Sequence, residues 1–544
     1  MGWVTSPFLF ASNMKNLWYK DAVFYELYIR SFYDTNDDGH GDLKGVIAKL
    51  DYLQELGITC IWLLPMYPSP LKDDGYDISD YYNIHADYGT LDDFKRLVEE
   101  VHTRGMRIVT DLVLNHTSDQ HPWFQEARSS RTNPFRDYYV WSDTDKKYSG
   151  VRLIFGDVET SNWAWDEATG QYYWHRFYTS QPDLNFDNPA VQEEMLNVVR
   201  FWLNLGVDGF RVDAPTYLFE REGTNCESLP ETHAYLKRLR AVINEEFPGR
   251  VLLAESNQQP RELIEYFGNG HDEFHMAFNF PLMTRIFLAF AEGNAEPIRS
   301  VIEQTPQTGE ECQWAIFLRN HDELTLEMAS PAEREHMYRE YAPDPKMILN
   351  LGLRRRLAPL LKGDHRRIEL ANALILSLPG TPVLYYGDEI GMGENLDLSD
   401  RNGVRTPMQW TDSENAGFTK AKPFAELVAG EYGHHHVNVD SQTANPDSLF
   451  HAIRRLLFIR KDQPAFGRGD IQMLDAPSSL LAFKRKYLDV TMVCVYNLGA
   501  TSETFTLPEN EQGGYINLLE NEEQVVESIQ LEPYSYVWMK KYGE

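Results

Sequence analysis

Three acidic residues occupy positions where reactive carboxylates are expected. Asp213 ends the run Gly-Phe-Arg-Val-Asp, Glu255 follows Leu-Leu-Ala, and Asp322 lies within Arg-Asn-His-Asp-Glu. Like charges that converge on one pocket cannot all stay ionised cheaply, so one carboxyl should keep its proton near neutral pH and act as an acid. A nucleophilic carboxylate, a protonated acid and a third charge beside an oxocarbenium-like state are the requirements of retaining glycoside hydrolysis.

A single acid at the end of a strand is more often a helix cap or a group that faces solvent. Arg211, however, lies two residues before Asp213 and therefore on the same face of that strand. The three acids together with this arginine favour catalysis over capping.

Short β-rich runs alternate with amphipathic helical stretches through most of the chain, the βαβ pattern of a parallel sheet in an α/β protein. One helix is expected over residues 43–57 and another over 90–105, opened by Thr90. Eight such units predict a (β/α)8 TIM barrel, whose reactive groups lie at the C-terminal ends of the strands. The runs are 24–30, 61–65, 107–114, 209–214, 251–256, 276–280, 314–320 and 382–387.

Two connections are too long to be simple turns. About 70 residues rich in Trp, Tyr and Asp follow the third run, which predicts an inserted subdomain over 116–187 near the barrel mouth. A second insertion after the seventh run, over 322–364, could act as a lid. The barrel is assigned to 1–115 and 188–465, and a C-terminal antiparallel β-sandwich to 466–544, where the helical pattern stops.

The composition excludes several classes of partner. The 544 residues include 51 Lys plus Arg against 82 Asp plus Glu, a net charge of −31, so the average surface repels nucleic acid and anionic lipid. No run approaches the ~20 apolar residues of a membrane-spanning helix. Nucleotide-binding glycine strings and Ser or Cys nucleophile signatures are also missing, so we expect a small-molecule substrate and no organic cofactor. The oligomeric state, including a homo-oligomer, stays open.

The cysteines and the first residues indicate a cytoplasmic protein. Cys60, Cys226, Cys312 and Cys494 show no Cys-x-x-Cys spacing, which favours a reducing compartment. Residues 7–11 are too short an apolar stretch, without preceding basic residues, for a signal peptide. The match of residues 1–6 to the loose myristoylation pattern is of a kind that arises by chance.

Four stretches, in order, resemble the four sequence regions of the α-amylase superfamily of (β/α)8 glycosidases: Asp111 to His116, Gly209 to Asp213, Glu255, and Asn320 to Asp322. Residues 181–185, Gln-Pro-Asp-Leu-Asn, are similar to the fifth region of its oligo-1,6-glucosidase branch. Residues 220–233 and 400–410 resemble the trehalose synthases of this superfamily, although strings similar to the second also occur in related glucosidases.

The resemblance implies a role for each residue at a motif position. Asp213 becomes the nucleophile, Glu255 the general acid/base and Asp322 the stabiliser of the transition state. Pairing of Asp73 with Arg401 would close the pocket beyond the non-reducing end, so action on a terminal glucose is expected. The other residues that would contact this glucose are Tyr76, as a stacking aromatic, and His116, Arg211 and His321.

What attacks the glucosyl-Asp213 intermediate decides the product. Tyr217, Glu323 and Glu327 resemble groups that line the second sugar site of trehalose synthases, although Glu323 and Glu327 fit a solvated loop equally well. The expected activity is retaining transfer that interconverts maltose and trehalose with some hydrolysis. The alternative is a hydrolytic α-glucosidase acting on short maltose-type or isomaltose-type sugars.

One departure from the trehalose synthase pattern follows Glu255. Residues 256–260 read Ser-Asn-Gln-Gln-Pro, whereas the pattern is Ala-Asn-Gln-Trp-Pro. Gln259 in place of the indole predicts a looser second sugar site and more hydrolysis.

Two structural metal sites are expected. Asp34, Asn36, Asp38, the carbonyl of His40 and Asp42 follow the spacing of an EF-hand-type loop, but position twelve is Gly45 instead of glutamate, so Ca²⁺, Mg²⁺ or an ordinary acidic turn would fit. The resemblance implies a second, calcium site that pins the inserted subdomain to the fourth strand. Its ligands would be Asn115, Asp183, Glu220 and the carbonyls of Tyr217 and Leu218.

Overall fold

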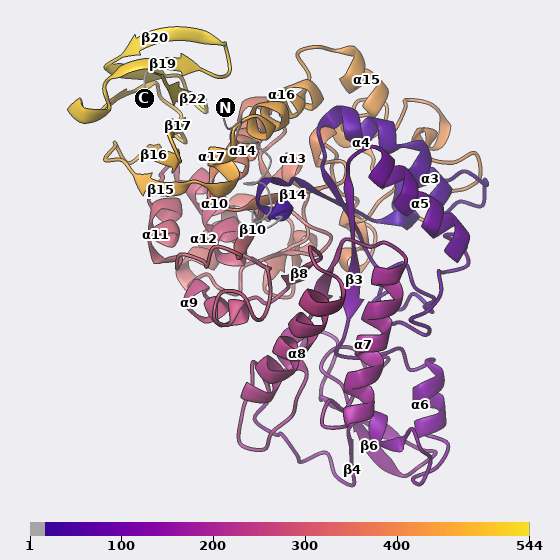
Figure 1. The fold of residues 1–544 in the computed structure, drawn as a ribbon. Helices are drawn as coiled ribbons and strands as arrows, with labels where there is room; N and C mark the ends of the chain where they lie inside the picture. Colours follow the sequence, from indigo (N-terminus) through magenta and orange to yellow (C-terminus); the bar gives the residue numbers. More distant parts are fainter. Residues whose placement is uncertain (1–16, 543–544) are drawn as a thin grey trace, which may run out of the picture.

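The computed structural model describes residues 17–542, so the considerations about residues 1–6 and 7–11 lie outside the described residues. At its centre is a closed barrel with the strand order β1-β14-β10-β9-β8-β7-β3-β2 (Figure 1). All neighbouring pairs are parallel. The strands are β1 (Phe24–Leu27), β2 (Cys60–Leu63), β3 (Arg107–Val113), β7 (Gly209–Asp213), β8 (Val251–Ala254), β9 (Met276–Phe278), β10 (Gln313–Phe317) and β14 (Thr381–Tyr385).

Each predicted run overlaps one of these strands, so the (β/α)8 barrel is confirmed. The strands are buried almost throughout, as expected when helices cover the outer face of a parallel sheet. Gly209 is needed where β7 meets β8, because a Cβ at this position would lie 2.2 Å from the carbonyl oxygen of Val251.

The helix ends follow the capping residues of the sequence. Thr90 and Asp93 form a capping box that opens α5 (Leu91–Thr103), and Asn188 caps α7 (Pro189–Asn204). The helix expected over 43–57 is instead two helices, because Lys49 leaves helical geometry where its ammonium lies over the rings of Tyr33 and Trp410. The helices around the barrel also include α3 (Leu43–Ala48), α4 (Leu50–Leu56), α8 (Pro230–Glu246), α10 (Phe280–Glu292), α11 (Glu296–Gln304), α14 (His365–Ser377) and α16 (Leu449–Lys461).

The segment between β3 and α7 forms a lobe that projects from the barrel, at the bottom of Figure 1. It contains α6 (Pro122–Ala127) and an antiparallel sheet of β4 (Trp141–Ser142), β6 (Gln171–Trp174) and β5 (Trp163–Asp166). Trp163 and Trp174 form a small core with Val151 and with Cys226 of the loop after β7. Because Cys226 belongs to the barrel part of the chain, this core packs the lobe against the pocket side of the barrel.

The segment after β10 also folds on its own small sheet. β11 (Leu324–Thr325) pairs with β13 (Gly352–Leu353), which pairs with β12 (Ile348–Leu349). The helices α12 (Pro331–Tyr341) and α13 (Leu357–Leu360) complete it. The domain boundaries given above stay predictions.

The C-terminal part is an antiparallel sandwich, as predicted. A sheet ordered β15-β16-β17-β22-β19-β20 faces the two-stranded sheet β18-β21. Side chains of β17 alternate: Val493 and Val495 lie between the sheets, whereas Cys494 and Tyr496 face the core of the barrel. The strands are β15 (Asp470–Met473), β16 (Leu480–Tyr487), β17 (Val490–Asn497), β18 (Glu503–Thr506), β19 (Gly513–Asn517), β20 (Glu522–Val526), β21 (Ser528–Leu531) and β22 (Tyr536–Lys541).

No helix within residues 17–542 is long and apolar enough to cross a bilayer.

Candidate active site

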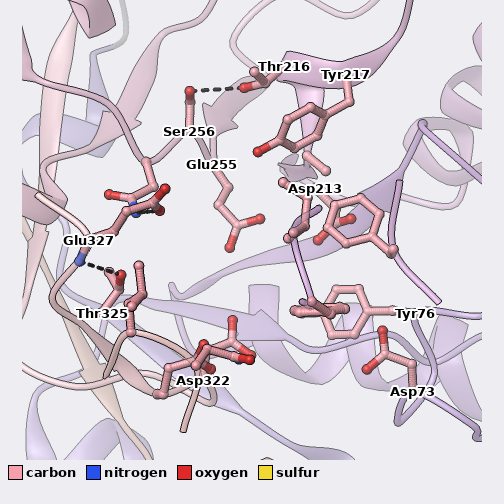
Figure 2. A pocket seen from close by; sticks show the side chains of 18 of the residues that line it. Asp73, Tyr76, Asp213, Thr216, Tyr217, Glu255, Ser256, Asp322, Thr325 and Glu327 are labelled. Atoms are coloured by element: carbon pink, nitrogen blue, oxygen red, sulfur yellow. Dashed lines mark hydrogen bonds between the residues drawn. The ribbon is translucent and has the colours of Figure 1, made fainter. Parts of the chain in front are cut away.

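A pocket opens at the C-terminal ends of the barrel strands, and Figure 2 shows the three predicted catalytic acids around it. Asp213 ends β7, Glu255 follows β8, and Asp322 lies in the connection after β10. Asp213 and Glu255 therefore face one cavity, as double displacement requires. Of the residues predicted to act on or bind the sugar, those that line the pocket are Asp73, Tyr76, His116, Asp213, Tyr217, Glu255, His321, Asp322, Glu323, Glu327 and Arg401.

Arg211 is the exception, because it lies beneath the floor of the pocket with 1% of its surface exposed. Its Nη1 donates to Asp213 Oδ1 at 2.8 Å and also to Asp111, and its Nη2 pairs with Glu255. The structure thus places Arg211 against the carboxylates and not in the space that a sugar would occupy. It holds Asp213 and Glu255 in a common orientation.

Asp213 and Glu255 are poised to exchange a proton near neutral pH. Burial raises the pKa of each to about 7, against the opposing attraction of Arg211. Two carboxyls in such close electrostatic contact titrate as a pair, so near pH 7 the pair holds one proton. One member can then act as the acid while the other is the nucleophile.

Asp322 lies in the opposite electrostatic environment. Burial alone would raise its pKa, but His321, Arg401 and Arg405 outweigh burial and hold the pKa of Asp322 well below its usual range. Arg401 Nη1 and Arg405 Nη2 donate to Asp322 Oδ1 at 2.9 Å and 3.0 Å. Asp322 therefore stays ionised and can stabilise positive charge on a sugar ring.

A buried ion pair lines the pocket. Arg401 Nη2 donates to Asp73 Oδ1 at 2.6 Å, and each side chain is 8% exposed. Gln181 Nε2 donates to the other oxygen of Asp73 at 2.9 Å. The predicted pairing of Asp73 with Arg401 is confirmed.

The turn after β7 positions the next wall of the pocket. Ala214 adopts φ 46°, a left-handed conformation uncommon for a residue with a side chain, and the chain then enters the short 3-10 turn Pro215–Tyr217. The Oγ1 of Thr216 lies 3.0 Å from the Oγ of Ser256, next to Glu255 (Figure 2). This bond ties the turn after β7 to the residue that follows the predicted acid.

The mouth of the pocket is crossed by contacts between the two inserted segments. Arg152 of the lobe pairs with Glu327 and donates to Glu227 Oε1 at 2.8 Å. Its Nη2 lies 3.4 Å from the hydroxyl oxygen of Tyr217. Asn257 Nδ2 donates to Glu327 Oε2 at 2.8 Å, so Glu327 connects the lobe, the loop after β8 and the second insertion.

A further contact reaches the pocket from the turn between β12 and β13. Asn350 has φ 49° and donates to Glu323 Oε1 at 2.8 Å. Three polar residues of the site were not predicted from the sequence: Arg152, Asn257 and Asn350. Each is a single polar residue in a long connection. The only sequence feature that could have indicated them is that they lie in an inserted segment or in the string 256–260, which departs from the family pattern.

Gln259 lies away from this pocket. Its side chain and that of Glu262 form the capping box of α9 (Pro260–Leu263), and its Nε2 lies 3.3 Å from the Sδ of Met328. Gln259 lines a separate hollow beside α10 and α11. The prediction that Gln259 increases hydrolysis stays a prediction, and any such effect must act through neighbouring residues.

The predicted calcium ligands bring two incompletely bonded carboxylates together. Asp183 Oδ2 and Glu220 Oε1 are buried and have no hydrogen-bond partner among the described residues. Burial raises the pKa of Asp183 to about 8, and burial together with Asp183 raises the pKa of Glu220 well above its usual range. Two such oxygens fit a hard cation, which prefers oxygen ligands.

The acidic loop of residues 34–42 is bonded differently. Asp34 accepts hydrogen bonds from the backbone N–H groups of Asn36, Asp37 and Gly39, and Asp42 caps α3 through Gly45 N–H. Asp38 Oδ1 accepts the backbone N–H of His40. Over the described part of the chain, no group of three or more His, Cys, Asp or Glu side chains is arranged to hold a metal.

Comparison with known proteins decides the family. The family model described as alpha amylase, catalytic domain, matches residues 26–353 and 347–469. The chain belongs to the α-amylase family. The trehalose synthase/amylase TreS of Mycobacterium tuberculosis is 55% identical over 509 residues, which cover 92% of this chain and 85% of that protein. The trehalose synthase of Pimelobacter is 52% identical over 498 residues, 88% of this chain and 87% of that protein.

A solved structure of this α-amylase family architecture is closely similar. The trehalulose synthase MutB from Pseudomonas mesoacidophila superimposes with a TM-score of 0.79 at 30% sequence identity, covering 96% of this chain and 99% of that one. The similarity thus extends through the barrel, both insertions and the C-terminal sandwich.

Proposed function

We propose that this protein transfers the terminal glucosyl unit of maltose within one bound disaccharide, interconverts maltose and trehalose, and releases some glucose. One observation carries the proposal: Asp213 and Glu255, both paired with Arg211, face one pocket that is also lined by the ion pair of Asp73 with Arg401 and by Arg152. The relatives named trehalose synthase, 52% and 55% identical, support it.

The first displacement uses the floor of the pocket. Glu255, as the protonated member of the pair, gives its proton to the glycosidic oxygen while Asp213 attacks the anomeric carbon. Asp322, held ionised by Arg401 and Arg405, stabilises the positive charge that develops on the ring. The result is a glucosyl ester of Asp213 and one molecule of glucose.

The second displacement decides the product. The released glucose must turn and present its anomeric hydroxyl, from which the Glu255 carboxylate takes a proton while the hydroxyl oxygen attacks the ester. The new linkage is then 1,1 with retained configuration. Water attacking instead gives glucose, so the contacts of Arg152 and Asn350 at the mouth favour transfer by retaining glucose and excluding water.

Incubation of the purified protein with maltose tests the proposal. Chromatography should show trehalose as the main early product and glucose as a minor one, and incubation with trehalose should give maltose. Finding glucose alone from maltose would contradict the proposal.

A hydrolytic α-glucosidase is the second candidate, and the exposure of the mouth favours it. The side chain of Arg152 is 45% exposed and that of Glu327 is 28% exposed, so water reaches their ion pair. The relative from Mycobacterium tuberculosis also carries amylase in its name. Hydrolysis of isomaltose as fast as maltose, with no trehalose formed, would establish this alternative.

A calcium ion is proposed at Asp183 and Glu220, completed by Asn115 and the carbonyls of Tyr217 and Leu218. The two unpartnered carboxylate oxygens support it, and the ion would fasten the lobe to the loop after β7 without entering the chemistry. Metal analysis after dialysis should find one ion per chain, lost in Asp183→Asn with a lower melting temperature. A second ion would place Ca²⁺ or Mg²⁺ in the loop containing Asp34, and no retained ion would contradict both sites.

We also propose that the reaction takes place in the cytoplasm. The four cysteines are all unpaired and buried, which suits a reducing compartment. Fractionation of cells that express the full-length protein would test this location.

A further inference from the structure

A fully buried glutamate lies behind the pocket and takes no part in the displacements described above. Glu26, on β1, has 0% of its surface exposed. Its Oε1 accepts the backbone N–H of His321 at 3.1 Å and lies 2.5 Å from Nδ1 of the same histidine. Its Oε2 has no hydrogen-bond partner within residues 17–542. Burying a carboxyl costs free energy unless hydrogen bonds compensate the loss of water, so the contacts with His321 stabilise Glu26 in this position.

The opposite edge of the His321 ring faces the pocket. Nε2 lies 2.9 Å from the Tyr76 hydroxyl and 3.2 Å from Asp322 Oδ2. Because Arg401 and Arg405 keep Asp322 ionised, its oxygens can only accept hydrogen bonds. The Tyr76 hydroxyl can either donate to Nε2 or accept from it, whereas an unprotonated Nε2 would turn a lone pair toward the carboxylate of Asp322. A hydrogen on Nε2 suits both contacts, so this geometry favours the ring protonated at Nε2.

A hydrogen on Nε2 restricts what Nδ1 can do. Nδ1 either accepts a hydrogen bond from protonated Glu26 or carries a second proton and donates it to ionised Glu26. Both arrangements keep one proton in the Glu26–Nδ1 hydrogen bond. Burial raises the pKa of Glu26 well above its usual range and lowers the pKa of His321 well below its usual range, which favours the first arrangement.

We propose that Glu26 is a positioning residue that holds this proton and so fixes His321 with Nε2–H directed at Asp322 and the transferred sugar. Only the identity of the transferred sugar, a glucosyl unit, rests on the proposed function. The charged and titratable groups that face the pair are Asp111 on β3, Arg211 on β7, Tyr385 on β14, and Tyr76, Asp322, Arg401 and Arg405 on the pocket loops.

Glutamine at position 26 keeps the shape of the side chain but cannot hold the proton. Its oxygen must take the place of Oε1, because the backbone N–H of His321 needs an acceptor there. The same oxygen then accepts from Nδ1–H, which leaves Nε2 unprotonated at neutral pH. Nε2 would face Asp322 as a second acceptor and could not donate to the sugar.

The kinetic test compares Glu26→Gln with Glu389→Gln. Glu389 is also 0% exposed, and its Oε1 accepts the hydroxyls of Tyr25 and Tyr52 at 2.8 Å and 2.7 Å, away from the residues that line the pocket. Glu26→Gln should lower kcat on maltose at pH 7 by on the order of tenfold or more, with a smaller change in KM. This deficit should narrow as the pH falls and the imidazolium forms. Glu389→Gln should stay within about twofold of the wild type.

The ratio of trehalose to glucose should not change in Glu26→Gln, because both products follow the same ester of Asp213. Equal kcat values and equal pH profiles for Glu26→Gln, Glu389→Gln and the wild type would overturn the proposal.

A readout independent of activity is the protonation of the ring. In protein labelled with ¹⁵N in its histidine rings, the His321 signals are those missing from His321→Gln. At pH 7, Nε2 of the wild type should be protonated, whereas in Glu26→Gln the proton should lie on Nδ1. An unprotonated Nε2 in the wild type would overturn the proposal, and this result does not depend on which sugars the protein converts.

Discussion

At the floor of the pocket the arginines that pair with the carboxylates are almost fully enclosed, since the side chain of Arg211 is 1% exposed and that of Arg405 is 2% exposed, whereas at the mouth Arg152 is 45% exposed. The floor groups come from barrel strands and the loops next to them, and the mouth groups come mainly from the two insertions. Removing one partner of a buried ion pair costs much free energy, because the other charge is left buried and unpaired. Removing one partner of an exposed pair costs little. We therefore expect bond cleavage to depend on the floor, and the choice between glucose and water as the attacking group to depend on the mouth.

The largest effect should come from the floor. Asp213→Asn removes the proposed nucleophile, but the asparagine side chain has the same shape and still lies next to Arg211. Turnover of maltose should therefore fall by at least ~10³-fold. Trehalose and glucose should disappear together, as chromatography of both products would show. A variant that still forms glucose at an appreciable rate would show that the two regions are not divided as described.

The buried pair of Asp73 with Arg401 should give the next largest effect. Asp73→Asn leaves Arg401 without its buried counter-charge, and Arg401 also holds Asp322, so kcat/KM for maltose should fall by about 10²-fold. Asp397→Asn is the matched control, because it removes a carboxylate from an exposed pair with Lys346. Similar kinetics for the two variants would contradict the role given to the buried pair.

At the mouth, the product ratio should change more than the rate. Arg152→Ala removes the contact with Glu327, so maltose consumption should change little while the ratio of glucose to trehalose rises by roughly fivefold, since an exposed pair is worth ~1 kcal/mol or less. The control is Arg131→Ala, which removes an exposed arginine from the same lobe. An equal rise of the glucose-to-trehalose ratio in the control would contradict the role given to the mouth.

The smallest effect concerns stability. A carboxyl whose pKa is raised in the folded state favours the protonated form there, so its contribution to stability is complete below about pH 4 and is lost as the pH rises through about 7. Asp213→Asn carries no such charge. Its melting temperature should exceed that of the wild type by about 2 °C at pH 8, and the two should coincide near pH 4. A lower melting temperature for the variant at pH 8 would argue against a costly buried charge at the floor.

The floor could be predicted from sequence because its residues follow directly from local patterns. Asp213 ends a buried strand, Glu255 comes immediately after another, and a barrel brings all strand ends to one pocket. The depth of Arg211 could not be predicted, because the strand pattern gives the face of a side chain and not whether it reaches the sugar or stops at the carboxylates.

The mouth could not be predicted, because its contacts join segments far apart in sequence. Arg152 and Glu327 are 175 residues apart, and nothing in either stretch indicates that they meet. One strand of the sandwich could not be predicted for a different reason. β20 is exposed at four of its five positions, so its sequence lacks the alternation of apolar and polar residues that marks a strand. Metal binding stays a prediction. The ligands of the proposed calcium site come from three segments that lie far apart in sequence.

The most direct test of the central claim is transfer in the presence of labelled glucose. The protein is incubated with maltose and an excess of ¹³C-glucose, and the mass of the trehalose formed early is measured. If the floor cleaves and the mouth retains the released glucose, the trehalose should be almost free of label. Trehalose carrying label in proportion to the free glucose, or no trehalose at all, would contradict the account.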